Sequence, residues 1–321
     1  MSLLVLSDED VRRTLDMASC IDAMEQALAG LERGDLSMPL RSVVRTSGEA
    51  MLGLMPAHRA GAEPLVGLKE IVVVPSNSGR GLDPHQGAVV LHDGGTGQLV
   101  AVLNASPITE IRTAAVSAVA TRLLARPESR QVAILGSGVQ GRSHALAMRE
   151  VLPDAELRVW SRTPAHAEAL ALEAHALPCT TVEEALAGAD VVCTCTASAE
   201  PLVALAHLAP GAHVNAVGSS GTWARELESD VVAAASLFVD RRESTLNEAG
   251  DYLAAVREAG IGPDHIRAEL GELLVGAHPG RVSDSELTVF ESLGLAVEDL
   301  AAADLCVRRA RELGLGTEVP F

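Results

Sequence analysis

The chain has 321 residues, 48% of them apolar but only 2% aromatic, which is enough for two domains, or one large one, with cores built mainly from leucine, valine and alanine. Its net charge of −18, together with the lack of any apolar stretch of ~18 residues, argues against a nucleic-acid partner, an acidic membrane surface or a membrane span. The five cysteines lack zinc-ligand spacing and the first residues lack the basic region of a signal peptide, so we expect a cytoplasmic protein without a metal site.

The first third of the chain changes from a helical pattern to a strand pattern. Residues 8–33 carry apolar side chains at three- and four-residue steps, which predicts a helix with Asp8 as its N-cap and Gly34 at its end. Strands are predicted at 41–45, 50–55, 65–75, 87–92 and 99–103, with a hairpin loop at 93–97. A helix over 106–126 follows, so this part favours an antiparallel α+β domain.

Residues 130–240 alternate strands with helices, the pattern of a doubly wound α/β domain. The predicted strands are 131–135, 156–160, 190–194, 213–217 and 237–239. The predicted helices are 142–150, 181–188, 246–259, 266–275 and a long helical region over 285–313. We therefore expect a substrate-binding and dimerisation domain over 1–117, joined by the C-terminal helix 300–321, and a Rossmann dinucleotide-binding domain over 118–299.

A G-x-G-x-x-G turn follows the first of these strands and opens a helix. Gly136 is expected to make the tight turn, Gly138 to let the backbone approach a pyrophosphate, and Gly141 to let helix and strand pack closely. Val139 and Gln140 lie between these glycines, where the unpaired N–H groups of a helix N-terminus bind phosphate. The strand–turn–helix context predicts a dinucleotide site.

The ends of later strands complete the predicted cofactor site. Ser161, Arg162 and Thr163 follow strand 156–160, where an NAD-specific domain places an acid on the ribose 2′-hydroxyl. An arginine there attracts a 2′-phosphate, so we expect NADPH to be preferred and NAD to be possible; alternatively, Arg162 is only a solvated residue at the next helix. Three further residues near the carboxyl edge of the sheet are assigned to the same site, namely Thr196, Val217 and Gly218.

The 25 basic residues include a single lysine, Lys69, inside an otherwise apolar segment. It could be a strand residue whose ammonium reaches solvent along the surface. An ammonium differs from a guanidinium because it is compact and changes protonation when desolvated, which favours a specific role.

These residues resemble the ornithine cyclodeaminase/mu-crystallin family over nearly the whole chain. The matching segments are 39–41, 52–56, 67–69, 108–115, 136–141, 216–218 and 289–300. The resemblance implies a Rossmann domain and a smaller domain that forms a homodimer through its sheet. Members include amino-acid cyclodeaminases, alanine dehydrogenases, reductases of cyclic ketimines and NADPH-binding proteins.

By this resemblance, Arg41, Lys69 and Arg112 match the positions that grip the substrate's α-carboxylate beside the nicotinamide. Three converging cations would form an anion trap, although any single arginine could equally make a surface ion pair. His85 matches a position at the cofactor-facing mouth of the site, or is simply a loop histidine. Because neither Lys69 nor Arg112 is a natural core anchor, replacing either is expected to leave folding almost unaffected.

The chain departs from the cyclodeaminase branch at two positions, where Gly53 and Ser220 replace acids that would handle substrate amines. We therefore expect an NADPH-dependent reductase of a small cyclic ketimine carboxylate, Δ1-pyrroline-2-carboxylate or Δ1-piperideine-2-carboxylate. The alternatives are an ornithine cyclodeaminase that uses NAD and a non-catalytic NADPH-binding protein. Lys69, His85 or a water could protonate the imine.

Overall fold

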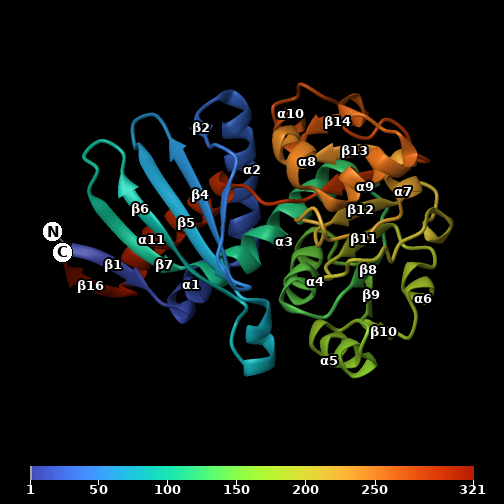
Figure 1. Ribbon diagram of the computed structural model, residues 1–321, viewed down its shortest axis with the longest axis horizontal. Coiled ribbons are helices and arrows are strands. Elements are labelled where there is room, and N and C mark those ends of the chain that lie inside the picture. The colour runs from blue at the N-terminus through green and yellow to red at the C-terminus, as the bar shows by residue number, and fades with distance from the viewer. Residues whose placement is uncertain (1) are drawn as a thin grey trace. The chain divides into compact units, whose positions relative to one another are not determined.

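The computed structural model describes residues 2–321, and the chain divides into two compact units (Figure 1). Unit 1 combines the residues up to Arg112 with Leu295–Phe321, and unit 2 is Thr113–Gly294. The sequence places these boundaries after residues 117 and 299, whereas the units divide after residues 112 and 294. No helix within residues 2–321 is both long and apolar enough to cross a membrane.

Unit 1 is built on a mostly antiparallel sheet in the order β16-β1-β7-β6-β5-β4-β2, with β3 on β4 and β1 parallel to β7. The strands are β1 (Ser2–Leu6), β2 (Leu36–Ser37), β3 (Ser42–Arg45), β4 (Met51–Arg59), β5 (Leu65–Val73), β6 (His85–Asp93), β7 (Leu99–Asn104) and β16 (Thr317–Pro320). The helices are α1 (Asp8–Thr14), α2 (Met17–Arg33), η1 (Pro75–Arg80) and α11 (Ala296–Leu313), and α3 (Ala105–Leu124) begins in this unit.

One face of this sheet is covered by α11, which lies on β4, β5 and β6 and also packs against α2 (Figure 1). The approach is close at Gly67 on β5, where a Cβ would lie 2.6 Å from Cδ1 of Leu300. Because side chains alternate along a strand, Lys69 points to the same face as Gly67, toward α11. The packing of α11 therefore decides what surrounds Lys69.

The helix expected over 8–33 is interrupted, because α1 and α2 are separate helices. Ser7 caps α1, and its hydroxyl accepts a hydrogen bond from the Asp10 amide at 3.2 Å, so Asp8 is not the N-cap. Asp16 then caps α2, and its carboxylate accepts from the Ser19 amide at 2.9 Å. Both caps satisfy amides that would otherwise lack partners, which favours a break at this point. Gly34 ends α2 with φ of +81°, as predicted.

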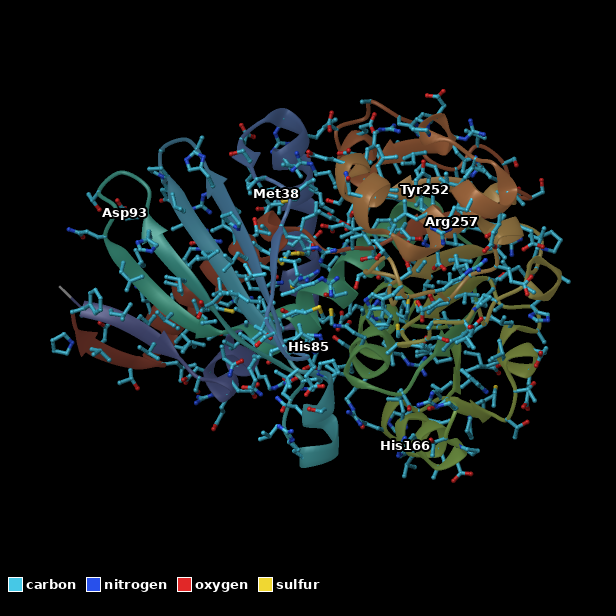
Figure 2. The ribbon with its side chains drawn as sticks, viewed as in Figure 1. Met38, His85, Asp93, His166, Tyr252 and Arg257 are labelled. Carbon is cyan, nitrogen blue, oxygen red and sulfur yellow. The ribbon has the colours of Figure 1, made fainter. Side chains whose placement is uncertain are left out.

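The hairpin loop predicted over 93–97 is confirmed between β6 and β7. Figure 2 labels His85 and Asp93, which begin and end β6. The Asp93 carboxylate accepts hydrogen bonds from the Gly95 and Thr96 amides at 3.1 and 2.7 Å, and this contact stabilises the turn.

Unit 2 contains a parallel sheet in the order β10-β9-β8-β11-β12-β15-β13-β14, which confirms the Rossmann domain. The strands are β8 (Gln131–Leu135), β9 (Glu156–Trp160), β10 (Leu177–Cys179), β11 (Val191–Thr194), β12 (His213–Ala216), β13 (Ser236–Val239), β14 (Ile266–Glu269) and β15 (Thr288–Glu291). The helical segments are α4 (Val139–Val151), α5 (Pro164–Ala174), α6 (Val182–Leu186), η2 (Leu205–His207), α7 (Ser229–Ala234), α8 (Arg242–Glu248), α9 (Gly250–Ala259), η3 (Pro263–His265) and α10 (Leu270–Leu274).

Two of these strands contradict helices expected from the sequence. Residues 288–291 form β15, between β12 and β13, and only the part from Ala296 onward is helical. All four residues of β15 are buried, so the strand shows no alternation of apolar and polar residues. Residues 266–269 form β14, and the helix expected over 266–275 is limited to α10.

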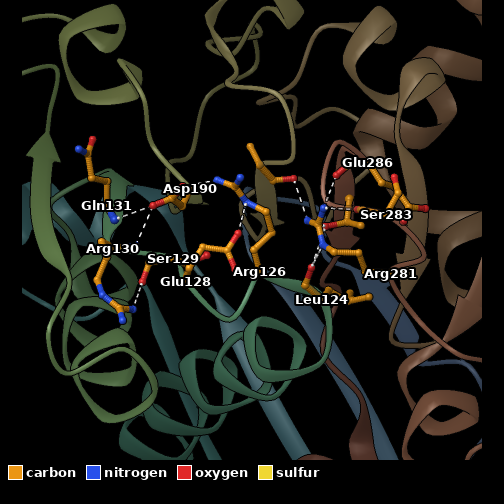
Figure 3. A network of polar contacts seen from close by, with 12 residues as sticks. Leu124, Arg126, Glu128, Ser129, Arg130, Gln131, Asp190, Arg281, Ser283 and Glu286 are labelled. Carbon is orange, nitrogen blue, oxygen red and sulfur yellow. Dashed lines mark hydrogen bonds and ion pairs between the residues drawn. The ribbon is translucent and has the colours of Figure 1, made fainter.

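A polar network closes the amino-terminal edge of this sheet (Figure 3). The Asp190 carboxylate, just before β11, accepts from the Arg130 and Gln131 amides at 2.7 and 3.0 Å and pairs with Arg126. Arg281 donates to the carbonyls of Leu124 and Glu286. Since ligands bind at the opposite, carboxyl edge of such sheets, this network serves stability.

Candidate active site

Two positions of the turn between β8 and α4, Gly136 and Gly141, require glycine. Gly136 has φ of +118°, its amide donates to the Trp160 carbonyl at 2.8 Å, and a Cβ there would lie 2.5 Å from the Cys195 carbonyl oxygen. A Cβ on Gly141 would lie 2.1 Å from the Gly136 carbonyl oxygen. Both glycines therefore have the roles predicted for them in the turn and in helix packing.

Gly138 differs from these two, because a Cβ there would meet no atom within 4 Å. It is the N-cap of α4 and, having no side chain, makes no side-chain capping bond to this helix. Val139, the first residue of α4, is 57% exposed. Open space at a helix N-terminus whose N-cap residue is glycine is what a pyrophosphate requires, so these residues fit a dinucleotide.

The end of β9 lies directly beside this turn. The hydroxyl groups of Ser137 and Ser161 are hydrogen-bonded at 2.8 Å. Arg162 and Thr163 follow and are exposed, and Thr163 is the N-cap of α5 without a side-chain capping bond. The arrangement offers hydroxyl groups and a guanidinium, and no acid, at the position where an NAD-specific domain carries a carboxylate.

The loops after β11 and β12 carry the remaining predicted cofactor residues. The Thr196 amide and hydroxyl each donate to Oε1 of Glu226 at 2.6 Å, and the Gly218 amide donates to Oε2 at 2.7 Å. Val217 is buried, and its amide donates to the Thr194 carbonyl at 3.1 Å. Glu226 was not predicted from the sequence, because it lies in the long segment between β12 and α7 and no local pattern marks it.

Lys69 and Arg112 come together in unit 1 through two acids on α11. The Lys69 ammonium lies 2.7 Å from Oδ2 of Asp299, while Arg112 donates from Nε to Oδ1 of Asp299 and from Nη1 to Oε2 of Glu298, both at 3.0 Å. Lys69 is 3% exposed and Arg112 4%. Two buried cations are thus matched by two buried carboxylates, and their binding of a substrate carboxylate stays a prediction.

The burial overturns the expectation that these cations contribute little to folding. Removing one partner of a buried ion pair leaves an uncompensated charge in the interior, which costs ~3–5 kcal/mol. Glu298 also accepts from the Leu295 amide at 3.1 Å, so it caps the helix that carries both acids. The cluster therefore supports the fold of unit 1.

The ammonium of Lys69 has an altered acidity. The pKa of Lys69 is lowered from 10.5 to about 8, mainly by burial and also by the charge of Arg112, although Asp299 and Glu298 oppose the shift. The lysine is thus mainly protonated at pH 7 and can lose its proton within the physiological range. Such a group is suited to proton transfer.

The other two predicted site residues lie elsewhere in unit 1. Arg41 is half-buried in the segment just before β3, and its participation in carboxylate binding stays a prediction. The His85 side chain is 54% exposed, and its Nδ1 lies 4.0 Å from the Asp83 carboxylate. Desolvation lowers the pKa of His85, Lys69 lowers it further, and Asp83 opposes both. His85 is therefore mainly neutral at pH 7.

The acids that hold the two cations were missed in the sequence. Glu298 and Asp299 follow the apolar run 293–297, just as Lys69 interrupts an apolar strand. Two adjacent acids beside an apolar run indicate a buried ion pair, as a lysine within an apolar strand does, because charged side chains are buried in a core only when they are paired there.

Comparisons with known proteins agree with this architecture. The family model of the ornithine cyclodeaminase/mu-crystallin family matches residues 1–313. The chain is 41% identical over 307 residues to the ketimine reductase mu-crystallin of Mus musculus, covering 94% of this chain and 95% of that protein.

Two solved structures are similar over the full length. The Δ(1)-pyrroline-2-carboxylate reductase of Thermococcus litoralis, in complex with NADH and L-proline, has a TM-score of 0.92 and 33% identity and covers 99% of this chain and 100% of that one. An archaeal alanine dehydrogenase dimer with bound NAD has a TM-score of 0.94 and 30% identity and covers 100% of both chains. This chain therefore belongs to the ornithine cyclodeaminase/mu-crystallin family.

Proposed function

We propose that this protein reduces the C=N bond of a small cyclic ketimine carboxylate, with Δ1-pyrroline-2-carboxylate and Δ1-piperideine-2-carboxylate as the candidate substrates. The observation that carries the proposal is the buried pair of Lys69 and Arg112 held by Asp299 in unit 1, on a chain that also contains a dinucleotide turn in unit 2. The similarity to a ketimine reductase and to a pyrroline-2-carboxylate reductase supports the same reaction.

The cofactor would be held by unit 2. Gly136, Gly138 and Gly141 would receive the pyrophosphate with the first turn of α4, and Thr196, Val217 and Gly218 would line the other half of the site. The bound dinucleotide would supply the hydride. The protein's part is to bind it, to orient it and to exclude water.

Arg162 favours NADPH over NADH. Its exposed guanidinium, flanked by Ser161 and Thr163, can pair with the negative charge of a 2′-phosphate, whereas the 2′-hydroxyl of NADH carries no charge. The Thermococcus litoralis structure contains NADH. The proposed preference for NADPH therefore rests on these three residues and not on that similarity.

The substrate carboxylate would be bound by Arg112 and Lys69, with Arg41 as the third cation. Asp299 and Glu298 hold the two buried cations in place, so binding would not require long side chains to be ordered first. Fixing the carboxylate fixes the adjacent imine carbon, and such positioning supplies much of the rate in a hydride transfer.

Reduction adds a hydride to the imine carbon and a proton to the nitrogen. Lys69 is the better proton donor, because its pKa of about 8 keeps it charged at pH 7 while His85 is mainly neutral there. The ammonium would donate to the nitrogen and recover its proton from water. Asp299 would stay ionised and hold the ammonium in position.

The test is a comparison of substrates with purified protein. We expect NADPH to be oxidised with either imine, yielding proline or pipecolate, and little ammonia to be released from L-ornithine with NAD. Ammonia and proline from ornithine, without reduction of either imine, would identify a cyclodeaminase instead. Tight NADPH binding without turnover of any imine or amino acid would identify a binding protein.

A second copy of the chain is the proposed partner. Gly67 and Lys69 face α11, so Val66 and Val72 of β5 point to the opposite face, where they are 40% and 37% exposed, and Val44 of β3 is 51% exposed. Val44 and Val72 are both in register with Leu52 of β4. Exposed apolar side chains across neighbouring strands favour burial against a copy of the same sheet. We propose a homodimer that acts in the cytoplasm, where its five free thiols stay reduced.

A further inference from the structure

A buried carboxylate in unit 2 joins two loops at the ligand-binding edge of the parallel sheet. Glu226 is fully buried, with Oε1 accepting from the amide and hydroxyl of Thr196 and Oε2 accepting from the amide of Gly218. Thr196 follows β11 and Gly218 follows β12, and these strands are neighbours. The side chain of Glu226 therefore sets the distance between the two loops.

Gly218 packs closely against both the Glu226 side chain and the Thr196 backbone. A Cβ on Gly218 would lie 2.5 Å from Cδ of Glu226 and 2.1 Å from the Thr196 carbonyl oxygen. The loop after β11 also borders the dinucleotide turn, since Gly136 packs against the Cys195 carbonyl. The carboxylate thus shapes a part of the edge that is continuous with the phosphate-binding turn.

The backbone at Glu226 is also fixed by hydrogen bonds. Its amide and that of Leu227 donate to Oδ1 of Asp251 at 2.9 and 3.0 Å. Ser219, which follows Gly218, donates a hydrogen bond from its hydroxyl to the buried Glu291 of β15. A buried carboxylate is costly unless donors satisfy it, and three donors converge on Glu226. Burial raises the pKa of Glu226, while these hydrogen bonds oppose the shift.

We propose that Glu226 is a positioning residue for the nicotinamide half of the cofactor, acting through Thr196 and Gly218. This rests on the proposed function, in which these loops receive that half while the turn from Gly136 to Gly141 and Arg162 receive the pyrophosphate and the adenosine half. Glu226 is not itself expected to touch substrate or cofactor. Its role is to keep the two loops in one arrangement, so that the nicotinamide is bound in a single orientation.

The test substitutes Glu226→Gln, which keeps size and shape but leaves a single acceptor oxygen for the two loops. We expect Kd for NADPH to rise by ~10-fold or more, since a charged hydrogen-bond acceptor is lost. Binding of 2′-phospho-ADP-ribose, which lacks the nicotinamide, should change less than ~2-fold because the turn is untouched. Both tryptophans, Trp160 and Trp223, lie in unit 2, so energy transfer from tryptophan to the reduced nicotinamide reports NADPH binding. Fragment binding is followed by calorimetry.

Asp190→Asn is the matched control, because Asp190 also accepts from two backbone amides but lies at the opposite edge of the sheet. It should lower the melting temperature without changing either Kd. If Glu226→Gln does not fold, Glu226→Asp replaces it, because the shorter side chain keeps the charge but cannot reach both loops, and the same selective loss of NADPH binding is expected.

The outcomes separate the two proposals. Wild-type protein that binds neither NADPH nor the fragment would overturn the proposed function together with this inference. Wild-type binding of both, with the Glu226 variant weakening both ligands equally or neither, would overturn the inference alone. Selective loss of the complete dinucleotide supports it.

Discussion

Oδ2 of Asp299 lies 2.7 Å from Nζ of Lys69, and both side chains are buried in unit 1, at the start of α11 and in the middle of β5. The other oxygen of the same carboxylate accepts from Nε of Arg112 at 3.0 Å. One acid thus fixes an ammonium and a guanidinium at once. Two cations that are far apart in the sequence therefore form one cluster with a defined geometry. The expected effects of substitutions at Arg112, Lys69 and Asp299 depend on this geometry.

Arg112→Lys should impair substrate binding although it conserves the charge. A lysine cannot reproduce the fork that Arg112 presents to Asp299 and Glu298, so we expect KM for the imine to rise at least ~10-fold in steady-state assays. Arg33→Lys is the control, because Arg33 makes only an exposed pair with Asp35. An unchanged KM in Arg112→Lys would exclude this arginine from the carboxylate site.

Arg112→Met should destabilise the protein, in contrast to what its sequence context suggests. It leaves Glu298 and Asp299 buried beside one cation, and the expected loss of unfolding free energy is ~3–5 kcal/mol in urea titrations. Arg33→Met, at an exposed pair, should cost ~1 kcal/mol or less. Equal stability of the two variants would contradict the burial of the cluster.

Imine reduction should lose rate in alkaline solution. Lys69 is protonated below its pKa of about 8 and neutral above it, so kcat/KM should be constant at lower pH and fall as the pH rises through about 8. Lys69→Ala should lower kcat/KM by ~10²-fold or more. A wild-type profile that stays flat up to pH 9.5 would remove Lys69 from the proton-donor role.

Asp299→Asn should move this alkaline limb to lower pH. The Asp299 charge favours the ammonium form and raises the pKa of Lys69, so a neutral amide removes this support and the pKa falls below about 8. Asp304→Asn is the matched control, because Asp304 lies on the same helix as Asp299 and makes a partly buried ion pair with Arg59 of β4. This substitution should leave the pH of the alkaline limb unchanged. A limb that shifts equally in both variants would indicate a general loss of structure.

Cofactor choice should depend on the residues after β9. Ser161→Asp combined with Arg162→Ala introduces an acid for the ribose hydroxyl and removes the cation, so the ratio of kcat/KM values should move from NADPH toward NADH. Arg142→Ala, at an exposed pair with Glu173 on the neighbouring helix, should not change the ratio. A wild-type preference for NADH would contradict the proposal.

The exposed strand face should mediate self-association. Val44→Asp with Val72→Asp places charges on the apolar face of β3 and β5, so light scattering at micromolar concentration should show a dimer for wild type and a monomer for the double variant. Leu172→Asp, at an exposed leucine on α5, should leave the dimer intact. A monomeric wild-type protein would contradict the proposed partner.

The sequence alone determined the features that depend on local chemistry. Gly136 and Gly141 were predictable because φ of +118° at Gly136, and contacts at both residues that are closer than a Cβ permits, require glycine. Lys69 stood out as a lone lysine in an apolar strand. The end of α2 at Gly34 and the hairpin at Asp93 follow from the same kind of local rule.

Tertiary structure decided what surrounds these residues, because ion pairs and strand pairing join positions far apart in the chain. Lys69 and Asp299 are separated by most of the sequence, so no local pattern shows that the acid neutralises the lysine or that both are buried. Residues 288–291 become a strand because β12 and β13 flank them, and their apolar run by itself suits a helix equally well. Glu226 likewise acquires its role only where two loops converge on one buried carboxylate.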